Sequence, residues 1–515
     1  MTRRNRIPAS ALMSRQPKMI AALHQTMTLP RILAAPVAAT LLLAAPTLTA
    51  AQTDPQAQAT AAYAHMQRGD YAAAATAAER AVAGAPDNAD WRLLLVDAYL
   101  RTDRPADALA AIQPLANRSD YPVQSRLAQA AAAAGRKDLA LEAYAKAAAG
   151  APDAESRAFL TRSHIAALVE AKRLVEARAA FDAAKANGAL EGSAPLDLAN
   201  LALAVGDDAT AHEAFAQANT AKPLSGSSAL DAAYNARRLG RDADAVRYFR
   251  QGLDSAQRGE ITLDEQRSFA IRREVETLER RWGASALISR GVAAAAPGAA
   301  LGADQRGVVQ AGGEVYYRLG GYRSGRPIDV FARAFQTLDA ETGDATGGKT
   351  TQGWIGVRWK PIAETNLILE GSRMVALGDL ARDDWMVRAA WSADQGVDLR
   401  MDRTSWPTWR VYADLAHIVD ADQTIGLLEG RAGRSFRIGE RSVLTPYAVV
   451  RADYDNGLSN KDAIGAGAGL AWRHWFRETP YTAPASFIEL SLDYRARLSG
   501  DDRAEGTFVT FSLSY

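Results

Sequence analysis

The chain ends in "EGTFVTFSLSY", residues 505–515, in which apolar and small polar side chains alternate. Val509, Phe511, Leu513 and Tyr515 share one face of an extended strand, and the intervening residues share the other. Such period-two alternation predicts a strand with one apolar face. Two kinds of protein satisfy it: a soluble sheet that turns this face to its core, and a membrane barrel that turns it to lipid.

The same period extends back to residue 284. About twelve segments of roughly ten residues show it, which is the length of a tilted membrane strand. Turns rich in Gly, Asp and Asn separate them, as in "DAETGDATGGK" (339–349) and "DYDNGLSNKD" (453–462), and such short connections predict an antiparallel meander. Tryptophans lie near segment ends, where a membrane barrel carries its aromatic girdle: Trp354, Trp359, Trp385, Trp391, Trp406, Trp409, Trp472 and Trp475.

Most segments carry charges of both signs on the face opposite the apolar one. A soluble sandwich would turn that face to solvent, whereas a barrel would turn it to a wet lumen. The aromatic positions and the terminal Tyr515, which resembles the assembly signal of bacterial outer-membrane barrels, favour a barrel over residues 284–515 that Tyr515 helps to close. The residues predicted to line its lumen are Glu314, Arg318, Arg333, Arg358, Glu370, Arg410, Tyr412, Asp414, Arg451, Asp453, Arg473, Glu489, Asp493 and Arg495.

The N-terminal region indicates export. The stretch "ILAAPVAATLLLAAPTLTAAQ" (32–52) is an apolar run followed by small residues, as in a secretory signal peptide. A membrane anchor is the alternative, but the run is short for a span and is interrupted by two prolines. We therefore assign residues 1–51 to a signal-peptide region, with Met19 or Met27 as alternative starts.

An alanine-rich repeat follows. The stretches "RGDYAAAATAAERAVAGAP" (68–86), "AGRKDLALEAYAKAAAGAP" (134–152) and "VGDDATAHEAFAQANTAKP" (205–223) align with a glycine second and a proline last. With Asp103, Ala171 and Gly240 at the equivalent turns, the units recur every 32 to 36 residues, which is the period of the tetratricopeptide repeat. We therefore predict an α-solenoid of such repeats over residues 55–256 and a connecting helix over residues 257–283.

Stacked helical hairpins form a superhelix whose first helices line a concave groove. Solvent exposure alone is the alternative explanation for any polar residue there. The residues predicted to face the groove are Tyr63, Asp97, Arg101, Asn200, Tyr234, Arg237 and Arg238.

Composition argues against several functions. The net charge of +1 gives no field that would recruit nucleic acid, and the absence of cysteine excludes thiolate chemistry. The six histidines are scattered, and "GAGAGL" (465–470) lies in a strand pattern where small residues permit close packing. Paired carboxylates such as Glu489 and Asp493 are ordinary lumen residues in a barrel. We therefore predict no enzyme, no cofactor and no metal site.

Together, the signal-like N-terminus, the repeats, a charged helix ending in "RRW" (280–282) and the barrel resemble the bacteriophage N4 adsorption protein A (NfrA) family. The strongest local pieces are the repeats and the stretch from "RRWGASALISRG" (280–291) through "GGEVYYRLG" (312–320) to the terminal strand. The chain is also similar to polysaccharide-export porins of the PgaA type. These resemblances imply an outer-membrane protein, embedded in lipid, that passes an exopolysaccharide chain outward. They also imply that periplasmic repeats engage the polymer, an inner-membrane glycosyltransferase or another export partner, and that phages use such proteins as receptors.

A second hypothesis remains open. A barrel of about twelve strands lies between side-chain-filled barrels of eight strands and open porins of sixteen, so its lumen can be narrow or plugged. The protein would then be a periplasmic protein-binding scaffold, anchored by a barrel that does not conduct.

Overall fold

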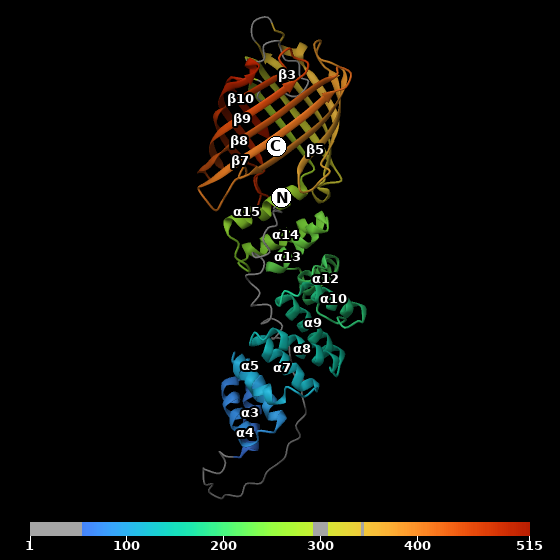
Figure 1. Ribbon diagram of the computed structural model, residues 1–515, viewed down its shortest axis with the longest axis vertical. Helices are drawn as coiled ribbons and strands as arrows, with labels where there is room; N and C mark the ends of the chain where they lie inside the picture. The colour runs from blue at the N-terminus through green and yellow to red at the C-terminus, as the bar shows by residue number, and fades with distance from the viewer. Residues whose placement is uncertain (1–53, 292–306, 341–343) are drawn as a thin grey trace. The chain divides into compact units, whose positions relative to one another are not determined.

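The computed structural model describes residues 54–291, 307–340 and 344–515 (Figure 1). The predicted signal-peptide region, residues 1–51, lies outside the described residues. The described residues divide into two compact units, on either side of a boundary between residues 94 and 95, and each unit is described separately below.

The first unit contains helices α3 (Pro55–Arg68) and α4 (Tyr71–Gly84) and the start of α5 (Ala89–Arg101). Helix α3 begins where Asp54 accepts a hydrogen bond from the backbone N–H of Gln56 at 3.0 Å, and it ends at Gly69, whose φ of +79° suits glycine. The two helices pack through buried alanines, which let their backbones approach closely.

The second unit begins within α5 and continues as further antiparallel helix pairs, which confirms the predicted repeats. An alanine from the second helix of each pair is buried at the helix contact. Three phenylalanines of these second helices are also fully buried: Phe181, Phe215 and Phe249. The helices are α6 (Pro105–Ile112), η1 (Gln113–Leu115), α7 (Tyr121–Ala133), α8 (Lys137–Ala149), α9 (Ala154–Glu170), α10 (Leu174–Ala186), α11 (Pro195–Ala204), α12 (Asp208–Ala221), α13 (Gly226–Arg238), α14 (Asp242–Gln257) and α15 (Glu265–Glu279).

One repeat turn differs from the alignment. The turn residue needs a left-handed backbone, which Gly135, Gly206 and Gly240 supply with φ of +71°, +76° and +69°. In the unit between α9 and α10 that conformation belongs to Lys172, with φ of +61°, and not to Ala171 as predicted. Neither Ala171 nor Lys172 is a glycine, so the residue type did not identify which of the two adopts the left-handed conformation.

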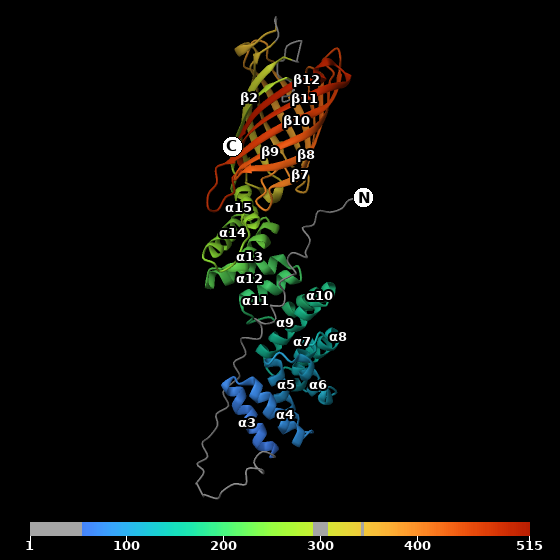
Figure 2. The same ribbon diagram turned by 90° about the vertical axis from the view of Figure 1, so that its left-hand side faces the viewer.

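The rest of the chain forms a closed antiparallel barrel of twelve strands, as predicted, in which each strand pairs with its sequence neighbours and β1 pairs with β12. Figure 2 shows β12, β11, β10, β9, β8 and β7 following one another along its wall. The strands are β1 (Trp282–Arg290), β2 (Val309–Leu319), β3 (Ile328–Asp339), β4 (Gln352–Trp359), β5 (Asn366–Ala376), β6 (Asp384–Gln395), β7 (Ser405–Ile418), β8 (Gln423–Gly439), β9 (Ser442–Asp455), β10 (Asp462–Phe476), β11 (Ser486–Gly500) and β12 (Gly506–Ser514). Short 3-10 turns η3 (Arg323–Gly325), η4 (Gly347–Thr350) and η5 (Asp502–Ala504) lie between strands.

The chain end completes the barrel wall. The backbone N–H of Tyr515 donates to the carbonyl of Ala284 at 2.8 Å, and that of Ala284 donates back at 3.1 Å. The Tyr515 ring lies 5.3 Å from the ring of Trp282. No sheet edge is therefore left where the first and last strands meet.

The outer face of the barrel is apolar. Exposed side chains on this face include Val315, Ile355, Val387, Leu415, Leu428, Val450, Leu492 and Phe511, which come from strands all around the wall. A continuous apolar band of this kind suits a lipid environment. Among the helices that the structure describes, none combines the length and apolarity needed to cross a membrane.

The last helix, α15, docks on the end of the barrel where β1 begins. Phe269 is buried in a cluster that includes Leu399, Trp406 and Trp475 from barrel strands and loops. Arg273 donates to both carboxylate oxygens of Asp398, at 2.7 and 3.1 Å. A first helix of a repeat normally packs on its own second helix, so here the barrel end covers the apolar face that α15 would otherwise expose.

We expect Phe269→Ala to loosen α15 from the barrel, because truncation of a buried phenylalanine costs about 3 kcal/mol or more. Local opening of α15 should then be roughly a hundred-fold more frequent. Limited trypsin digestion checks this, since α15 contains Arg267, Arg272 and Arg273. The control is Ala270→Ser at an exposed neighbouring position; equal cleavage rates for the two variants would contradict the docking role of Phe269.

Candidate functional site

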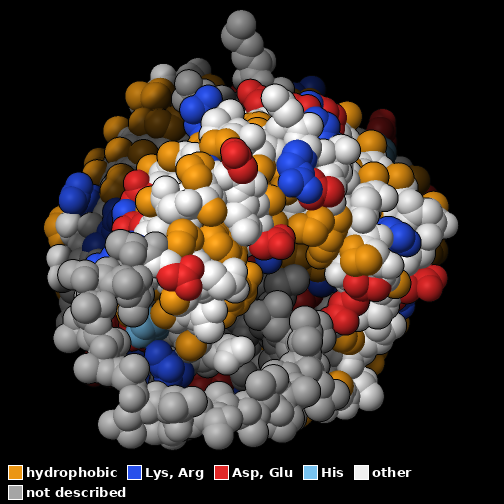
Figure 3. Space-filling model, turned by 90° about the horizontal axis from the view of Figure 1, so that it is seen from below, with side chains coloured by type: hydrophobic (Ala, Val, Ile, Leu, Met, Phe, Trp, Pro, Cys, Tyr) orange, Lys and Arg blue, Asp and Glu red, His pale blue; other side chains and the backbone are white. Residues whose placement is uncertain are grey.

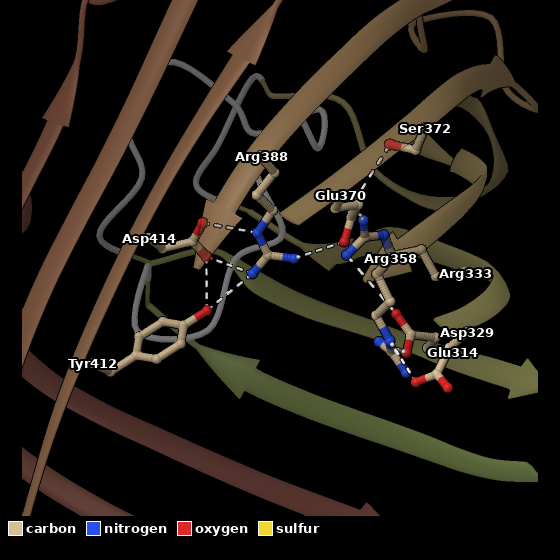
Figure 4. Close-up of polar contacts among 9 residues, drawn as sticks. All are labelled: Glu314, Asp329, Arg333, Arg358, Glu370, Ser372, Arg388, Tyr412 and Asp414. Carbon is tan, nitrogen blue, oxygen red and sulfur yellow. Dashed lines mark hydrogen bonds and ion pairs between the residues drawn. The ribbon is translucent and has the colours of Figure 1, made fainter. Parts of the chain in front are cut away.

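The barrel interior holds a network of polar side chains, called the first network, that reaches across six strands (Figure 4). Strand alternation turns each of these residues inward. Its members are Glu314 on β2, Asp329 and Arg333 on β3, Arg358 on β4, Glu370 and Ser372 on β5, Arg388 on β6, and Tyr412 and Asp414 on β7.

One half of the first network is centred on Arg358. Its guanidinium donates to Glu314 Oε1 at 2.5 Å and to Asp329 Oδ2 at 3.2 Å. Arg318 donates to the other oxygen of Asp329 at 3.1 Å. Arg333 forms an ion pair with Glu370, and its guanidinium also lies 4.6 Å from the centroid of the Phe331 ring. Strands far apart in sequence are thereby linked through the interior.

The other half is centred on Arg388. This side chain donates to Asp414 Oδ1 at 2.8 Å and to the Tyr412 hydroxyl at 2.9 Å, and one of its nitrogens lies 3.5 Å from Glu370 Oε2. The Tyr412 hydroxyl in turn donates to Asp414 Oδ2 at 2.7 Å. Glu370, only 6 % exposed, therefore joins the two halves.

A second network lies against the opposite part of the wall. Arg431 donates to Glu429 at 2.6 Å, and Arg451 donates to Asp453 at 2.7 Å. Arg495 pairs with Asp493 at 3.1 Å and stacks on the Phe508 ring, with the guanidinium carbon 3.3 Å from the ring centroid. The members of this second network are Glu429, Arg431, Tyr447, Arg451, Asp453, Asp493 and Arg495.

The "GAGAGL" stretch of β10 provides room for the second network. A Cβ at Gly469 would lie 2.6 Å from the Tyr447 ring and 2.7 Å from the Cβ of Asp493. The structure therefore agrees with close packing at Gly469, because Tyr447 and Asp493 occupy the space that a larger side chain would need. No phosphate is needed to explain them.

Charge is balanced in both networks. The first network, with Arg318, places four arginines against four carboxylates, and the second places three against three. Pairing is required, because an unpaired charge away from water costs several kcal/mol. Arg495 is 2 % exposed, Asp493 4 % and Arg451 5 %. These three side chains are therefore shielded from water inside the barrel.

The structure places all of the residues predicted to line the lumen on the interior face, and it brings most of them together in the two networks. Arg473 and Glu489 instead pair at 2.5 Å near the end where α15 docks, and Arg410 approaches the Tyr412 ring but forms no ion pair within the described residues. Their hydrogen bonds are directed at one another, whereas the sequence suggested shallow sites for sugar hydroxyls. The analysis of the sequence missed Asp329, Arg388, Glu429, Arg431 and Tyr447, which share the inward parity of their predicted neighbours.

Several residues predicted to face the groove form ion pairs between helices. Asp97 pairs with Arg126 on the next first helix at 2.9 Å. Arg238 pairs with Asp208 at 2.6 Å, and this hydrogen-bonded pair lowers the pKa of Asp208.

Arg237 pairs with Glu274 of α15 at 2.9 Å. Burial nevertheless raises the pKa of Glu274, although the Arg237 guanidinium opposes that rise. Tyr234 is half-buried, with its ring edge-on to Phe249 at 5.0 Å, and burial raises its pKa. These two residues therefore support the contacts among α13, α14 and α15.

The remaining groove predictions differ in exposure. Tyr63 and Arg101 are exposed, and Asn200 is half-buried. Figure 3 shows side chains of both charges scattered among apolar and uncharged ones on the face seen from below. No group of three or more metal-ligating side chains occurs within residues 54–291, 307–340 and 344–515.

Glu370→Gln should lower the free energy of unfolding by about 3–5 kcal/mol, because Arg333 and Arg388 would stay buried without their shared carboxylate. The difference in the free energy of unfolding can be measured by urea titration of both proteins in the same detergent, with gel mobility as the readout of folding. The control is Asp402→Asn in the loop after β6, where hydrogen bonds from Arg400 lower the pKa of Asp402 to about 2. That exposed pair should contribute less than about 1 kcal/mol. Equal losses for the two variants would rule out the structural role of the first network.

Comparison with known proteins agrees with this architecture. Residues 343–511 match a family model described as bacteriophage N adsorption protein A C-term, and residues 65–120 match a tetratricopeptide repeat model. No curated protein matches the chain.

Several solved structures are similar to part of this chain at low sequence identity. PilW, a type IV pilus biogenesis factor, is 16 % identical over 44 % of this chain and 98 % of its own, with a TM-score of 0.34. The Pseudomonas aeruginosa pilF structure is also 16 % identical, over 40 % and 96 %, with a TM-score of 0.33. A Parabacteroides merdae tetratricopeptide repeat protein is 14 % identical over 43 % and 85 %, also with a TM-score of 0.33. Tetratricopeptide repeats joined to a closed barrel, with residues 343–511 matching the bacteriophage N adsorption protein A C-terminal family, together fit an outer-membrane protein.

Proposed function

We propose that this protein is an outer-membrane scaffold, in which the barrel is an anchor and the helical repeats bind a protein partner in the periplasm. The observation that carries the proposal is that two charge-balanced networks of mutually paired side chains occupy the barrel interior. Repeat arrays of this kind present extended surfaces suited to other proteins. The proposal includes no catalytic step.

The pairing of these interior groups argues against free passage in this conformation. Conduction needs sites weak enough to release a solute at each step. Here the interior groups are already bound to one another, and a charge left buried without its partner would cost several kcal/mol. A barrel that serves only as an anchor, in contrast, needs no continuous pore from one side of the membrane to the other.

The connection between helices and strands supports a periplasmic location for the repeats. Strand β1 follows α15 directly, and Tyr515 pairs with Ala284 at the same end of the barrel. If this end faces the periplasm, neither the repeats nor the chain terminus has to cross the membrane during assembly. The opposite orientation would require a folded or unfolded array of helices to pass through it.

Passage of an exopolysaccharide, supplied by an inner-membrane glycosyltransferase, is the second candidate function. It is favoured by a chamber of about 80 Å³ that remains beside the second network and is lined by Trp406, Trp475, Thr408 and Thr445 among others. Aromatic faces and hydroxyls suit a sugar. This function would require both networks to separate. The matched family's name also makes phage adsorption a candidate role for the loops at the end of the barrel away from α15.

The scaffold proposal predicts that the full-length protein shows no steady ion conductance in planar bilayers. The same sample must show heat-modifiable gel mobility, which establishes that the barrel is folded. Steady conductance from the folded protein would reject the anchor proposal in favour of the export channel.

It also predicts a defined sidedness. After cell fractionation, the protein should remain with the outer membrane, and trypsin should cleave the repeats only once that membrane has been permeabilised. Recovery in the soluble periplasmic extract would contradict membrane anchoring, and cleavage of the repeats in intact cells would contradict their periplasmic location.

A further inference from the structure

The chamber beside the second network contains an arginine unlike its neighbours. It is bounded by β7 to β11 and by residues 396–398 of the loop before β7. Arg410 lines it from β7, and its interior position follows from the buried Trp406 and Thr408 on the same face of that strand. Arg410 is nevertheless exposed, so its side chain borders open space within the barrel.

Arg410 also lacks a carboxylate partner. Each arginine of the two networks has a carboxylate oxygen within 4.0 Å, and so does Arg473 in the chamber wall. Within the described residues Arg410 has no ion pair, and the contact it makes is with the ring of Tyr412, whose centroid is 5.9 Å away. Its charge is thus left uncompensated by hydrogen-bonded protein groups.

The strand register explains how this arises. On β8 the residue directly opposite Arg410 is Arg431, and like charges at opposite positions repel. On β6 the opposite residue is Asp394, but no ion pair joins the two side chains. Two other carboxylates near the chamber are engaged elsewhere, because Glu429 is bound to Arg431 and Glu489 to Arg473.

We propose that the chamber binds a small oxyanion group, a phosphate or a carboxylate, through the guanidinium of Arg410. A guanidinium matches the two oxygens of such a group and holds them with charge-assisted hydrogen bonds. The volume of about 80 Å³ admits a group of a few heavy atoms. An anion there also offsets the repulsion between Arg410 and Arg431. The site does not depend on the scaffold role.

Isothermal titration of the full-length protein in detergent, in chloride-free buffer, tests the site with inorganic phosphate and with glucuronate. Arg410→Gln should weaken binding at least ten-fold. Asp394→Asn, which removes a competing carboxylate, should strengthen it. The matched control is Arg434→Gln, because Arg434 is an exposed arginine of β8 on the outward face. The Arg434→Gln variant should bind each probe with the same affinity as the unsubstituted protein.

Binding of phosphate but not glucuronate would identify a free inorganic anion as the ligand, and tighter binding of glucuronate would identify the acidic group of a sugar. Lack of binding by both probes overturns the proposal, as does equal affinity in Arg410→Gln and the unsubstituted protein. Because Arg410 has no ion-pair partner to leave unpaired, Arg410→Gln should fold, and heat-modifiable gel mobility verifies this.

Discussion

The pairing of buried charges governs the barrel interior. Twelve strands enclose more space than an eight-stranded wall, so backbone and small side chains do not fill it. This chain places arginines in that space, and every buried arginine then requires a nearby carboxylate. Arg333 and Arg388 share Glu370, and Arg451 lies between Asp453 and Glu429. The apolar outer face and the closed wall depend on an interior that satisfies these charges.

Side-chain contacts also join the last repeat helices to the barrel. Helix α15 has no second helix of its own, and an uncovered apolar face would be costly in water. Phe269 is covered by barrel residues, and the Tyr481 hydroxyl in the loop before β11 donates to Asp254 of α14 at 2.8 Å. Two helices of the last repeats are therefore fastened to barrel loops, so this part of the array and the barrel form one body.

Local patterns predicted much of this architecture, and pairwise geometry could not be predicted. Alternation of side chains gave the inward face of each strand, and the repeat period gave the helical hairpins. The partners of Arg358 could not be read in this way, because Glu314 lies 44 residues away and their contact depends on the register of three strands. Arg410 and Arg431 share the same inward parity, yet one is paired and the other is not. The left-handed conformation of Lys172 could not be predicted either, because lysine has no preference for positive φ.

These contacts also constrain any transition to an open channel. Opening for a polymer would separate pairs in both networks, and every charge left buried without its partner would oppose that opening. A partner on the repeats can supply such energy only by binding the open state more tightly than the closed one. Its effect would have to pass through α15, where Phe269 and the Arg273–Asp398 pair join the array to the barrel. An anchor requires this junction to be rigid, whereas a gated channel would require it to have two stable arrangements.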